Sequence, residues 1–599
     1  MDARCSESLQ NDSGILHSTN ISELLISYLK QLSIEYVFGV PGGAIEPLYN
    51  ALAQSERDGG PRSIVARHET GAAFMADGYA SQTGRIGVCC ATTGPGATNL
   101  LTGVASAYAN NVPMLVITAQ TSLTTFGKGA FQESSCTGVN IVGMFEFCTR
   151  YNTLVSHADQ FERKLVAALM TACGSTPGPV HLSLPLDVMR SATNLAAPSY
   201  DIVRLLDRPA VHDAEALNLL FSLLSDAKSI VFVIGEGASE AIGSVLTAAL
   251  LLKAKLVTTP HGKGLVSPYH PSFFGVVGFA GHSSAVDVLK DPELDTVVCI
   301  GTTLGEWASN GWDADLLLNE RLIHIDEQEN NFTYTPMARL HVRGRIVTLF
   351  EQLLRHLNTL SREAGDEPPN PPCAPPMNDG VYSFTLDDEA GFRDNDKPIK
   401  PQRLMYELSR MFPPHTRYYA DTGASFAWAI HYLHPFDRRM MGSRNAHGGL
   451  FRACLEFSSM GWAIGCSVGA ALAKRDQPMV CITGDGSLLM SGQEITVAVQ
   501  ESLPIIFVVL NDSSLGMVKH GQRLAGAESV GTDIPLVDFA ASARSMGADA
   551  YTVHSPKDLL VLDGKLLTLQ SRPTLLDVYI DQEAVPPISA RIRSLKGGV

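Results

Sequence analysis

MVCITGDGS (residues 479–487) and IIFVVLND (residues 505–512) are the two stretches that decide the fold. Each contains an unbroken apolar run, which is typical of a strand buried on both faces of a parallel sheet. Each run ends in aspartate beside glycine or asparagine, the residues of turns. Open α/β sheets bind ligands beyond the carboxyl ends of such strands, so we expect chemistry to lie directly after both runs.

Similar apolar runs recur along the chain and alternate with segments of helical period. The predicted strands are 86–91, 114–119, 230–234, 296–300, 479–483 and 505–510. Strands that alternate with helices and are joined by glycine-rich turns predict an α/β protein with doubly wound parallel sheets. A chain of 599 residues is too long for one hydrophobic core, so several such domains are expected.

Two irregular stretches divide the chain. One lies at 190–211, and the other is SREAGDEPPNPPCAPP at 361–376, whose prolines favour extended and exposed backbone. They leave three blocks of ordinary domain size, which predicts three doubly wound domains. The expected layout is a flexible N-terminal segment 1–19, domains at 20–188, 210–356 and 398–583, a proline-rich linker 357–397 and a C-terminal tail 584–599.

Composition narrows the class of partner. The sequence is 45% hydrophobic and 18% charged with a net charge of −16, which describes a globular protein without the clustered Lys and Arg that bind nucleic acid. Eleven cysteines show no CxxC or repeated spacing, so reduced thiols are expected. No apolar window approaches a membrane span and no targeting segment is recognised. We expect a cytoplasmic protein that acts on small molecules, with no nucleic-acid or membrane partner.

Asp485 and Asp512 are the first candidate metal ligands. Each follows a predicted strand, so neighbouring parallel strands would bring both carboxylates to one edge of a sheet. Glycines on both sides of Asp485 let a phosphate approach the backbone. Paired oxygens suit Mg²⁺, whose remaining ligands are usually phosphate and water. Either motif alone is a common turn in α/β proteins, but the two motifs at this spacing are specific.

The N-terminal block carries a second set of motifs. ARHETGAAFMADGYA (66–80) places Glu69 at the start of a predicted helix, TGPGATN (93–99) follows the predicted strand 86–91, and GVPGG occupies 39–43. A lone glutamate there would only complement the helix dipole, and a lone glycine turn is a weak signal. Together with GDG and ND, these segments resemble the thiamine-diphosphate enzymes in sequence and in order, over nearly the whole chain.

The resemblance implies a role for each of these residues. Asp485, Asp512 and the main-chain carbonyl of Ser514 would bind magnesium; acetolactate synthases usually have Asn in place of Asp512, and both keep an oxygen ligand. Glu69 would hydrogen-bond the aminopyrimidine and stabilise the tautomer that removes the cofactor's C2 proton. The residues that would contact thiamine diphosphate are Pro41, Gly42, Thr93, Gly94, Asn99, Gly423, Ala424, Ser425, Met460, Gly484, Gly486, Ser487 and Met517.

Two further segments supply cofactor contacts in this reading. DTGASF (421–426) resembles the diphosphate loop of the family, and a helix N-terminus there would favour an anion, although a capped turn explains it equally well. SSMGWAIGCSVGAALA (458–473) places Met460 where the family has a bulky apolar residue beneath the cofactor; a core methionine at a helix start is the alternative. In family members Glu69 and the GDG turn belong to different subunits. The resemblance therefore implies a homodimer or homotetramer with active sites at the subunit interface.

GAFQE (129–133) and GMV (516–518) resemble the acetolactate synthases among these enzymes. Phe131 and Gln132 would border the reacting carbons, with simple packing as the alternative for Phe131. The resemblance implies decarboxylation of a 2-oxo acid, with pyruvate as the expected donor, and ligation of the acyl carbanion to an acceptor carbonyl. The adjacent active-site histidines of pyruvate decarboxylases are not found near the expected loop.

Two departures from the acetolactate synthases affect the acceptor. Four residues after the methionine of GMV those enzymes have a tryptophan that shapes the acceptor pocket, whereas this chain has Gly521. The middle-block segment IGTTLGEW (300–307) lacks the arginine that contacts flavin and the acceptor carboxylate. We therefore expect a wider pocket and an acceptor other than pyruvate or 2-oxobutyrate. FAD binding stays open, because GEG (235–237) is either a nucleotide loop or a structural turn.

Three alternative functions were compared with the sequence. A 2-oxo-acid decarboxylase or oxidase would yield an aldehyde or peroxide in place of a condensed product. A non-catalytic relative would be expected to lack Glu69, Asp485 or Asp512, and all three are present. A nicotinamide dehydrogenase needs a complete GxGxxG with a downstream acidic residue, which the middle block lacks.

Overall fold

The computed structural model describes residues 19–588, except residues 194, 196, 208–210, 365–369, 374–381, 436 and 438–448. The expected flexible segment 1–19 lies outside the described residues apart from its last residue. Most of the expected tail 584–599 and part of the linker 357–397 also lie outside them. Within the described part of the chain, every helix is too short or too polar to span a bilayer.

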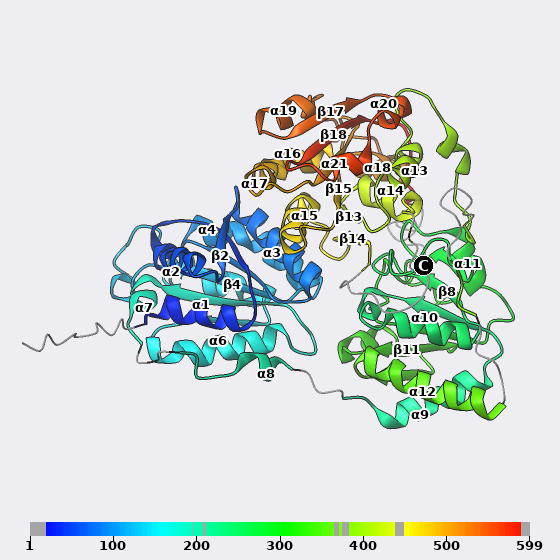
Figure 1. Cartoon of the computed structure of the whole chain (residues 1–599), viewed down its shortest axis with the longest axis horizontal. Coiled ribbons are helices and arrows are strands. Elements are labelled where there is room, and N and C mark those ends of the chain that lie inside the picture. Colours follow the sequence, from blue (N-terminus) through cyan, green and yellow to red (C-terminus); the bar gives the residue numbers. More distant parts are fainter. Residues whose placement is uncertain are drawn as a thin grey trace, which may run out of the picture.

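Three six-stranded sheets organise the part of the chain that the structure describes, and all of their paired strands are parallel. Figure 1 shows the N-terminal domain in blue and cyan beside the C-terminal domain in yellow to red, with the green middle domain below the latter. The predicted α/β class with doubly wound parallel sheets is confirmed. All six predicted strands occur, and their ends differ by one residue at most.

The N-terminal sheet has the strand order β2-β1-β3-β4-β6-β5. Its strands are β1 (Tyr36–Val40), β2 (Arg62–Val65), β3 (Gly87–Ala91), β4 (Met114–Gln120), β5 (Tyr151–Leu154) and β6 (Pro179–Pro185). Its helices are α1 (Ile21–Gln31), α2 (Glu46–Arg57), α3 (Glu69–Thr83), α4 (Pro95–Ala109), α5 (Ile141–Phe145), α6 (Ala158–Ala172), α7 (Leu186–Arg190) and α8 (Ile202–Leu206). The central strands β3, β4 and β6 are buried throughout, which explains the continuous apolar runs of β3 and β4; β6 also buries His181 and Ser183.

The middle sheet has the strand order β12-β11-β10-β7-β8-β9. Its strands are β7 (Ile230–Ile234), β8 (Lys255–Thr258), β9 (Phe273–Val276), β10 (Thr296–Ile300), β11 (Leu322–Asp326) and β12 (Leu340–Arg343). Its helices are α9 (Ala214–Asp226), α10 (Ile242–Leu251), α11 (Ser283–Leu289) and α12 (Ile346–Ala364).

The C-terminal sheet has the strand order β14-β13-β15-β16-β18-β17. Its strands are β13 (Arg417–Ala420), β14 (Phe451–Ala453), β15 (Met479–Gly484), β16 (Ile506–Asn511), β17 (Asp549–Val553) and β18 (Thr574–Tyr579). Its helices are α13 (Pro401–Met411), α14 (Ala424–Tyr432), α15 (Trp462–Ala473), α16 (Asp485–Ser491), α17 (Ile495–Gln500), α18 (Gly516–Leu524), α19 (Phe539–Ser545), α20 (Pro556–Leu560) and α21 (Gly564–Leu567).

The N-terminal and C-terminal sheets share one topology. Numbered from the start of each domain, both have the strand order 2-1-3-4-6-5. The order reverses between β1 and β3 in one sheet and between β13 and β15 in the other. Such reversals open a crevice at the carboxyl ends of the two strands, where α/β proteins bind ligands. The topology therefore provides one binding position in each of these two domains.

Helix α3 of the N-terminal domain packs against α15 of the C-terminal domain, and the two lie side by side at the centre of Figure 1. Glycines allow the close approach. A Cβ atom built on Gly78 would lie 2.0 Å from the carbonyl oxygen of Cys466, and one on Gly469 would lie 1.9 Å from that of Met75. The indole N–H of Trp462 donates to the Asp77 carboxylate at 2.8 Å across the same contact.

Candidate active site

The carboxyl ends of β13 and β15 are held together by Asp421, which is fully buried. Its carboxylate accepts the N–H of Gly461 at 3.1 Å and the hydroxyl of Thr483 at 2.9 Å. Burial raises the pKa of Asp421 to about 6. Asp421 thus fixes the switch point of the C-terminal sheet and the approach to α15.

The two predicted metal ligands lie next to each other at this edge of the sheet. One oxygen of Asp485 accepts the backbone N–H of Asp512 at 3.2 Å and that of Ser514 at 3.3 Å, and the other accepts the N–H of Gly486 at 2.7 Å. The Asp512 carboxylate also accepts the N–H of Ser514, at 3.2 Å. The loop 512–514 is therefore folded around the Asp485 carboxylate.

The paired carboxylates favour a cation. Burial raises the pKa of Asp485, and burial together with repulsion from Asp485 raises the pKa of Asp512 to about 8. A divalent ion would relieve this repulsion. No group of three or more His, Cys, Asp or Glu among the described residues could hold a metal on its own. Magnesium at this position would therefore need a carbonyl, a diphosphate and water in addition to the two carboxylates.

Polar groups and open space beside the pair fit a diphosphate. The buried hydroxyls of Ser487 and Ser514 have no hydrogen-bond partner among the described residues. Cβ atoms built on Gly423 and Gly484 would meet no heavy atom within 4 Å. Gly423, at φ +112°, precedes α14 without a side-chain cap, so the first backbone N–H groups of this helix are open to an anion.

The other predicted contacts of the C-terminal domain surround this space. The Met460 methyl carbon lies 3.2 Å from a Cβ built on Gly486, which places this side chain beside the GDG turn. Ala424 lies 3.9 Å from a Cβ built on Gly516, just before Met517, which is partly buried against the core. Ser425 differs from the expectation in one respect. Its hydroxyl donates to the Asp421 carbonyl at 2.8 Å, so it would offer a diphosphate only its backbone N–H.

Glu69 is the first residue of α3 and is only 8% exposed. Its carboxylate accepts the side-chain N–H of Asn99 at 3.0 Å. A Cβ built on Gly96 would lie 3.2 Å from the other carboxylate oxygen, so a side chain at this position would crowd Glu69. The TGPGATN turn therefore forms the wall against which Glu69 lies.

The GAFQE segment covers the same turn. The Thr93 hydroxyl donates to the Gln132 carbonyl at 3.0 Å, and the Gly94 N–H donates to the Ser134 hydroxyl at 3.0 Å. A Cβ built on Gly94 would lie 3.2 Å from the Cβ of Gln132. Phe131 instead points away from the chain and is 86% exposed.

The GVPGG turn approaches from the neighbouring strand. Gly42 follows β1, and a Cβ built on it would lie 2.6 Å from the Cβ of Thr92, which follows β3. Pro41 is exposed beside it. The turns 41–42 and 92–94 therefore meet at the switch point of the N-terminal sheet.

The single chain does not connect its two groups of predicted residues. Among the described residues, no hydrogen bond or ion pair joins Glu69, Asn99 or Gln132 to the residues around Asp485. The start of α3 instead contacts Glu494, beyond the far end of α16. Helix α16 has seven residues. At 1.5 Å per residue it spans about 10 Å, which separates this contact from Asp485 at its other end.

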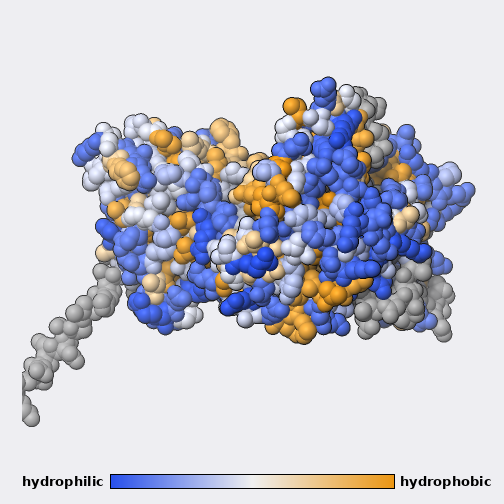
Figure 2. Space-filling model, turned by 90° about the horizontal axis from the view of Figure 1, so that it is seen from above, coloured by the Kyte–Doolittle hydropathy of each residue, from blue (hydrophilic) through white to orange (hydrophobic). Residues whose placement is uncertain are grey.

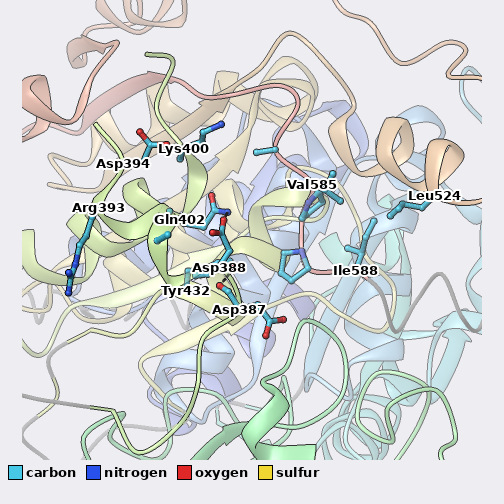
Figure 3. Close-up of a pocket in the computed structure, with 15 residues that line it drawn as sticks. Asp387, Asp388, Arg393, Asp394, Lys400, Gln402, Tyr432, Leu524, Val585 and Ile588 are labelled. Carbon is cyan, nitrogen blue, oxygen red and sulfur yellow. Dashed lines mark hydrogen bonds between the residues drawn. The ribbon is translucent and has the colours of Figure 1, made fainter. Parts of the chain in front are cut away.

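A large cavity of about 920 Å³ lies elsewhere, where the segments before and after the C-terminal domain meet that domain (Figure 3). Figure 3 shows Asp387, Asp388 and Gln402 on one side of it and Val585 and Ile588 on the other. Helices α14 and α18 contribute only their last residues to its lining, whereas the predicted cofactor residues lie at their first residues. The cavity is therefore distinct from the predicted cofactor site.

Comparison with known proteins identifies the family. Residues 19–140 match the thiamine pyrophosphate enzyme N-terminal TPP binding domain, residues 217–353 the central domain, and residues 421–578 the C-terminal TPP binding domain. The chain belongs to the thiamine pyrophosphate enzyme family. Thiamine pyrophosphate is thiamine diphosphate, so the predicted cofactor class is confirmed.

Members of this family resemble the chain over almost its full length. The probable acetolactate synthase large subunit of Methanocaldococcus jannaschii is 30% identical, with 95% of this chain and 93% of the relative covered. That of Methanococcus aeolicus is 29% identical over 95% and 94% of the two chains. The acetolactate synthase isozyme 2 large subunit of Escherichia coli is 28% identical over 94% and 96%.

Three buried polar residues of this thiamine pyrophosphate enzyme were missed as site residues by the sequence reasoning. They are Ser134, which holds Gly94, Asp421, which holds the C-terminal switch point, and Glu494, which holds the start of α3. Asp421 is the first residue of the DTGASF motif and Ser134 directly follows GAFQE, so an acid or a hydroxyl beside a glycine turn was an available signal in the sequence. The sequence gives only a weaker signal for Glu494, which is a single charged residue directly before the mainly apolar run ITVAV (495–499).

The GEG turn (235–237), a candidate nucleotide loop for FAD, packs directly against protein backbone. A Cβ built on Gly235 would lie 2.2 Å from the Gly301 carbonyl oxygen, and one on Gly237 would lie 3.0 Å from the Gly301 Cα. These glycines therefore allow the ends of β7 and β10 to meet. Glu236 between them pairs with Arg452 of the C-terminal domain at 2.7 Å.

Proposed function

We propose that this chain uses thiamine diphosphate and magnesium to decarboxylate a 2-oxo acid, with pyruvate as the expected donor, and to ligate the remaining acyl unit to a carbonyl acceptor. The observation that carries the proposal is the loop 512–514 folded around the buried Asp485 carboxylate, beside open glycines at a switch point. This arrangement suits a metal-bound diphosphate. The names of the relatives, which are acetolactate synthases, support the carboligase assignment.

Each group of residues would have a separate task. Bound thiamine diphosphate would supply the carbanion chemistry and the electron sink for decarboxylation. Asp485, Asp512 and the Ser514 carbonyl would hold magnesium, and the start of α14 would bind the diphosphate. Glu69, oriented by Asn99 at 3.0 Å, would hold a proton at the aminopyrimidine. Its low exposure would keep bulk water from this proton.

The acceptor pocket is proposed to be wider than in acetolactate synthases. A Cβ built on Gly521 would meet no heavy atom within 4 Å, so the side of α18 at this position faces open space. A larger acceptor aldehyde or ketone could use that space. The glycines of the loop 235–237 serve backbone packing, so this loop gives no support for FAD as a ligand.

We also propose that the active enzyme is a homodimer or homotetramer whose active sites lie between subunits. Large apolar side chains on the surface support an interface, with Phe131 86% and Phe147 85% exposed. Figure 2 shows hydrophobic side chains gathered in separate orange patches on a mainly hydrophilic face. Covering such patches is a common role of subunit contacts.

The domain boundaries and the location remain proposals. Each of the three sheets lies inside one of the ranges 20–188, 210–356 and 398–583, whereas α12 continues past residue 356 to Ala364. A cytoplasmic location and the lack of a nucleic-acid partner stay predictions from the sequence.

Product analysis tests the proposed reaction. Purified protein is incubated with magnesium, thiamine diphosphate and pyruvate, alone and with a panel of aldehydes and ketones, and the products are identified by mass spectrometry. We expect condensed 2-hydroxyketones that include an added acceptor. Acetolactate alone would contradict the changed acceptor, and free acetaldehyde without condensation would contradict ligation.

The variant Gly521→Trp is the matched control for the acceptor. It fills the open side of α18 and leaves the predicted cofactor residues unchanged. We expect it to lose the largest acceptors while still releasing carbon dioxide from pyruvate. An unchanged product range would contradict the position of the acceptor pocket.

A further inference from the structure

Glu494 is a completely buried glutamate that the proposed mechanism does not use. It ends the short 3₁₀ helix η7 (Gly492–Glu494), which follows α16. One of its carboxylate oxygens accepts the backbone N–H groups of His68 at 2.9 Å and Arg67 at 3.2 Å, and the other accepts that of Arg67 at 3.1 Å. These two amides directly precede Glu69, the first residue of α3. A carboxylate of the C-terminal domain therefore holds the backbone that carries Glu69.

The fit around this carboxylate is tight. A Cβ atom built on Gly71 would lie 2.3 Å from the Glu494 Oε1 atom, so the first turn of α3 accommodates Glu494 only because this residue is glycine. The Arg67 side chain strengthens the same contact by donating to the Thr496 hydroxyl at 2.7 Å and to the Gln500 side-chain oxygen at 2.8 Å. The segment before Glu69 is thus held through both its backbone and its side chain.

Glu494 also places a titratable group beside Glu69. The titratable groups that face its carboxylate are Arg67, His68 and Glu69. Burial raises the pKa of Glu494 to about 7; the amide hydrogen bonds and the Arg67 charge oppose this shift, and the Glu69 charge adds to it. The hydrogen bonds from the Arg67 and His68 amides to Glu494 are therefore charge-assisted only above about this pH.

We propose that Glu494 is a positioning residue for Glu69: its carboxylate fixes the backbone at the start of α3 and thereby places Glu69 for its step on the cofactor. The proposal rests on the proposed function, because it requires Glu69 to act on the bound cofactor. A purely structural role would affect stability alone. A positioning role also changes the rate and the pH dependence of the step that Glu69 performs.

The variant Glu494→Gln separates charge from geometry. The amide oxygen still accepts the N–H groups of Arg67 and His68, whereas the charge is lost. Without that charge the hydrogen bonds to both amides are weaker, so the step that Glu69 performs loses the pH dependence that the ionisation of Glu494, with its pKa of about 7, contributes. Glu494→Asp keeps the charge and shortens the reach, so it should misplace Glu69 with a smaller change in the profile.

Glu501→Gln is the matched control. Glu501 also joins the C-terminal domain to the N-terminal domain, since it pairs with Arg62 at 2.5 Å, and it pairs with Arg475 of its own domain at 3.4 Å. Among the described residues it has no hydrogen bond to the segment before α3. The control therefore weakens the same domain contact without touching the backbone of Glu69.

The experiment uses the full chain with thiamine diphosphate and magnesium. Exchange of the cofactor's C2 proton for deuterium is followed by NMR across the neutral pH range, and kcat with pyruvate is measured in parallel. Cofactor affinity and the melting temperature are measured for each variant as readouts that need no turnover. Glu69→Gln is included to test the underlying function.

We expect Glu494→Gln to bind the cofactor and to slow C2 exchange by about 10-fold or more, and to lack the rise in rate through neutral pH that the ionisation of Glu494 gives the wild type. Glu501→Gln should keep the wild-type exchange rate and profile, whatever its melting temperature. A Glu494→Gln variant that matches Glu501→Gln in rate and profile would overturn the proposal. Wild-type exchange in Glu69→Gln would instead overturn the role of Glu69 itself, which distinguishes the two failures.

Discussion

Asp512 adds a second negative charge to a site where Asp485 is already buried. Without a metal the repulsion is only partly offset, because the Asp512 and Ser514 amides donate to Asp485 and only that of Ser514 also donates to Asp512. The raised pKa of Asp512, about 8, expresses this cost. Each carboxyl binds its proton more tightly in the folded than in the unfolded protein. The folded state therefore carries more protons between about pH 4 and pH 8, and stability falls as the pH rises through this window.

Asp512→Asn should remove most of this pH dependence. Asparagine keeps an oxygen ligand and has no charge to bury. In the presence of a chelator we expect the variant to melt at a higher temperature than the wild type near pH 8, with the difference shrinking toward pH 5. Thermal unfolding across this range measures the difference.

Magnesium provides the control for this prediction. With magnesium and thiamine diphosphate the wild type should regain stability more than the variant, since the metal binds two carboxylates in one and a single carboxylate in the other. An equal rise in melting temperature for the two proteins at every pH, when magnesium and thiamine diphosphate are added, would contradict the assignment of Asp512 as a ligand.

Helices α3 and α15 cross so closely that glycine is required at their points of contact. Gly78 of α3 lies so close to Cys466 of α15 that even one added carbon would meet a backbone oxygen at 2.0 Å. A backbone atom cannot rotate away as a side chain can, so the helices would have to separate. The crossing carries the contact between the N-terminal and C-terminal domains.

Two glycine-to-alanine variants should therefore have opposite effects on stability. Gly78→Ala is expected to lower the free energy of unfolding by about 1 to 3 kcal/mol through overpacking. Gly521→Ala lies in helix α18 with no heavy atom within 4 Å of its Cβ, and should raise stability. We expect about 0.5 to 1 kcal/mol from its smaller backbone entropy loss. Denaturant unfolding of both variants measures the effects, and equal signs would contradict the packing described here.

The elements found from sequence were those with a continuous apolar run. The strands β3, β4, β7, β10, β15 and β16 are central in their sheets and buried throughout, apart from Gly484 at the end of β15, so their sequences alone predict them. Edge strands such as β5 and β17 have few buried residues and no such run, and they were not predicted. Burial on both faces, rather than strand propensity, made the prediction work.

The candidate site was predictable only where its residues lie in one motif. Glycine turns and their acids, such as the GDG turn, are local in sequence and directly readable. Glu494 acts on His68, which is 426 positions away, so its role depends on how two domains pack. No local pattern encodes that packing, which is why this residue emerged only from the structure.

Across the whole molecule, two sheets of the same topology each present a switch point. One carries Glu69, Asn99 and the GAFQE segment, and the other carries Asp485 and Asp512. A cofactor with a pyrimidine ring at one end and a diphosphate at the other needs both switch points. Within one chain the start of α3 lies at the far end of α16 from Asp485, so two chains are proposed to supply the two halves of each site.

Mixing two inactive variants tests this arrangement. Glu69→Gln and Asp485→Ala should each abolish most turnover as separate proteins. After mild dissociation and reassociation of an equal mixture, half of the dimers should combine one chain of each kind. Each such dimer has one site with both substitutions and one site with neither, so about a quarter of the wild-type activity should return. Steady-state decarboxylation of pyruvate measures the recovery.

The unmixed variants, treated in the same way, form the control and should stay inactive. Recovery that depends on reassociation requires that Glu69 of one chain work with Asp485 of another, because no single chain in the mixture holds both. A mixture without recovery, although mixed dimers are detected by native mass spectrometry, would mean that each chain builds its own site. In that case α3 would have to move along α16 toward Asp485 when the cofactor binds.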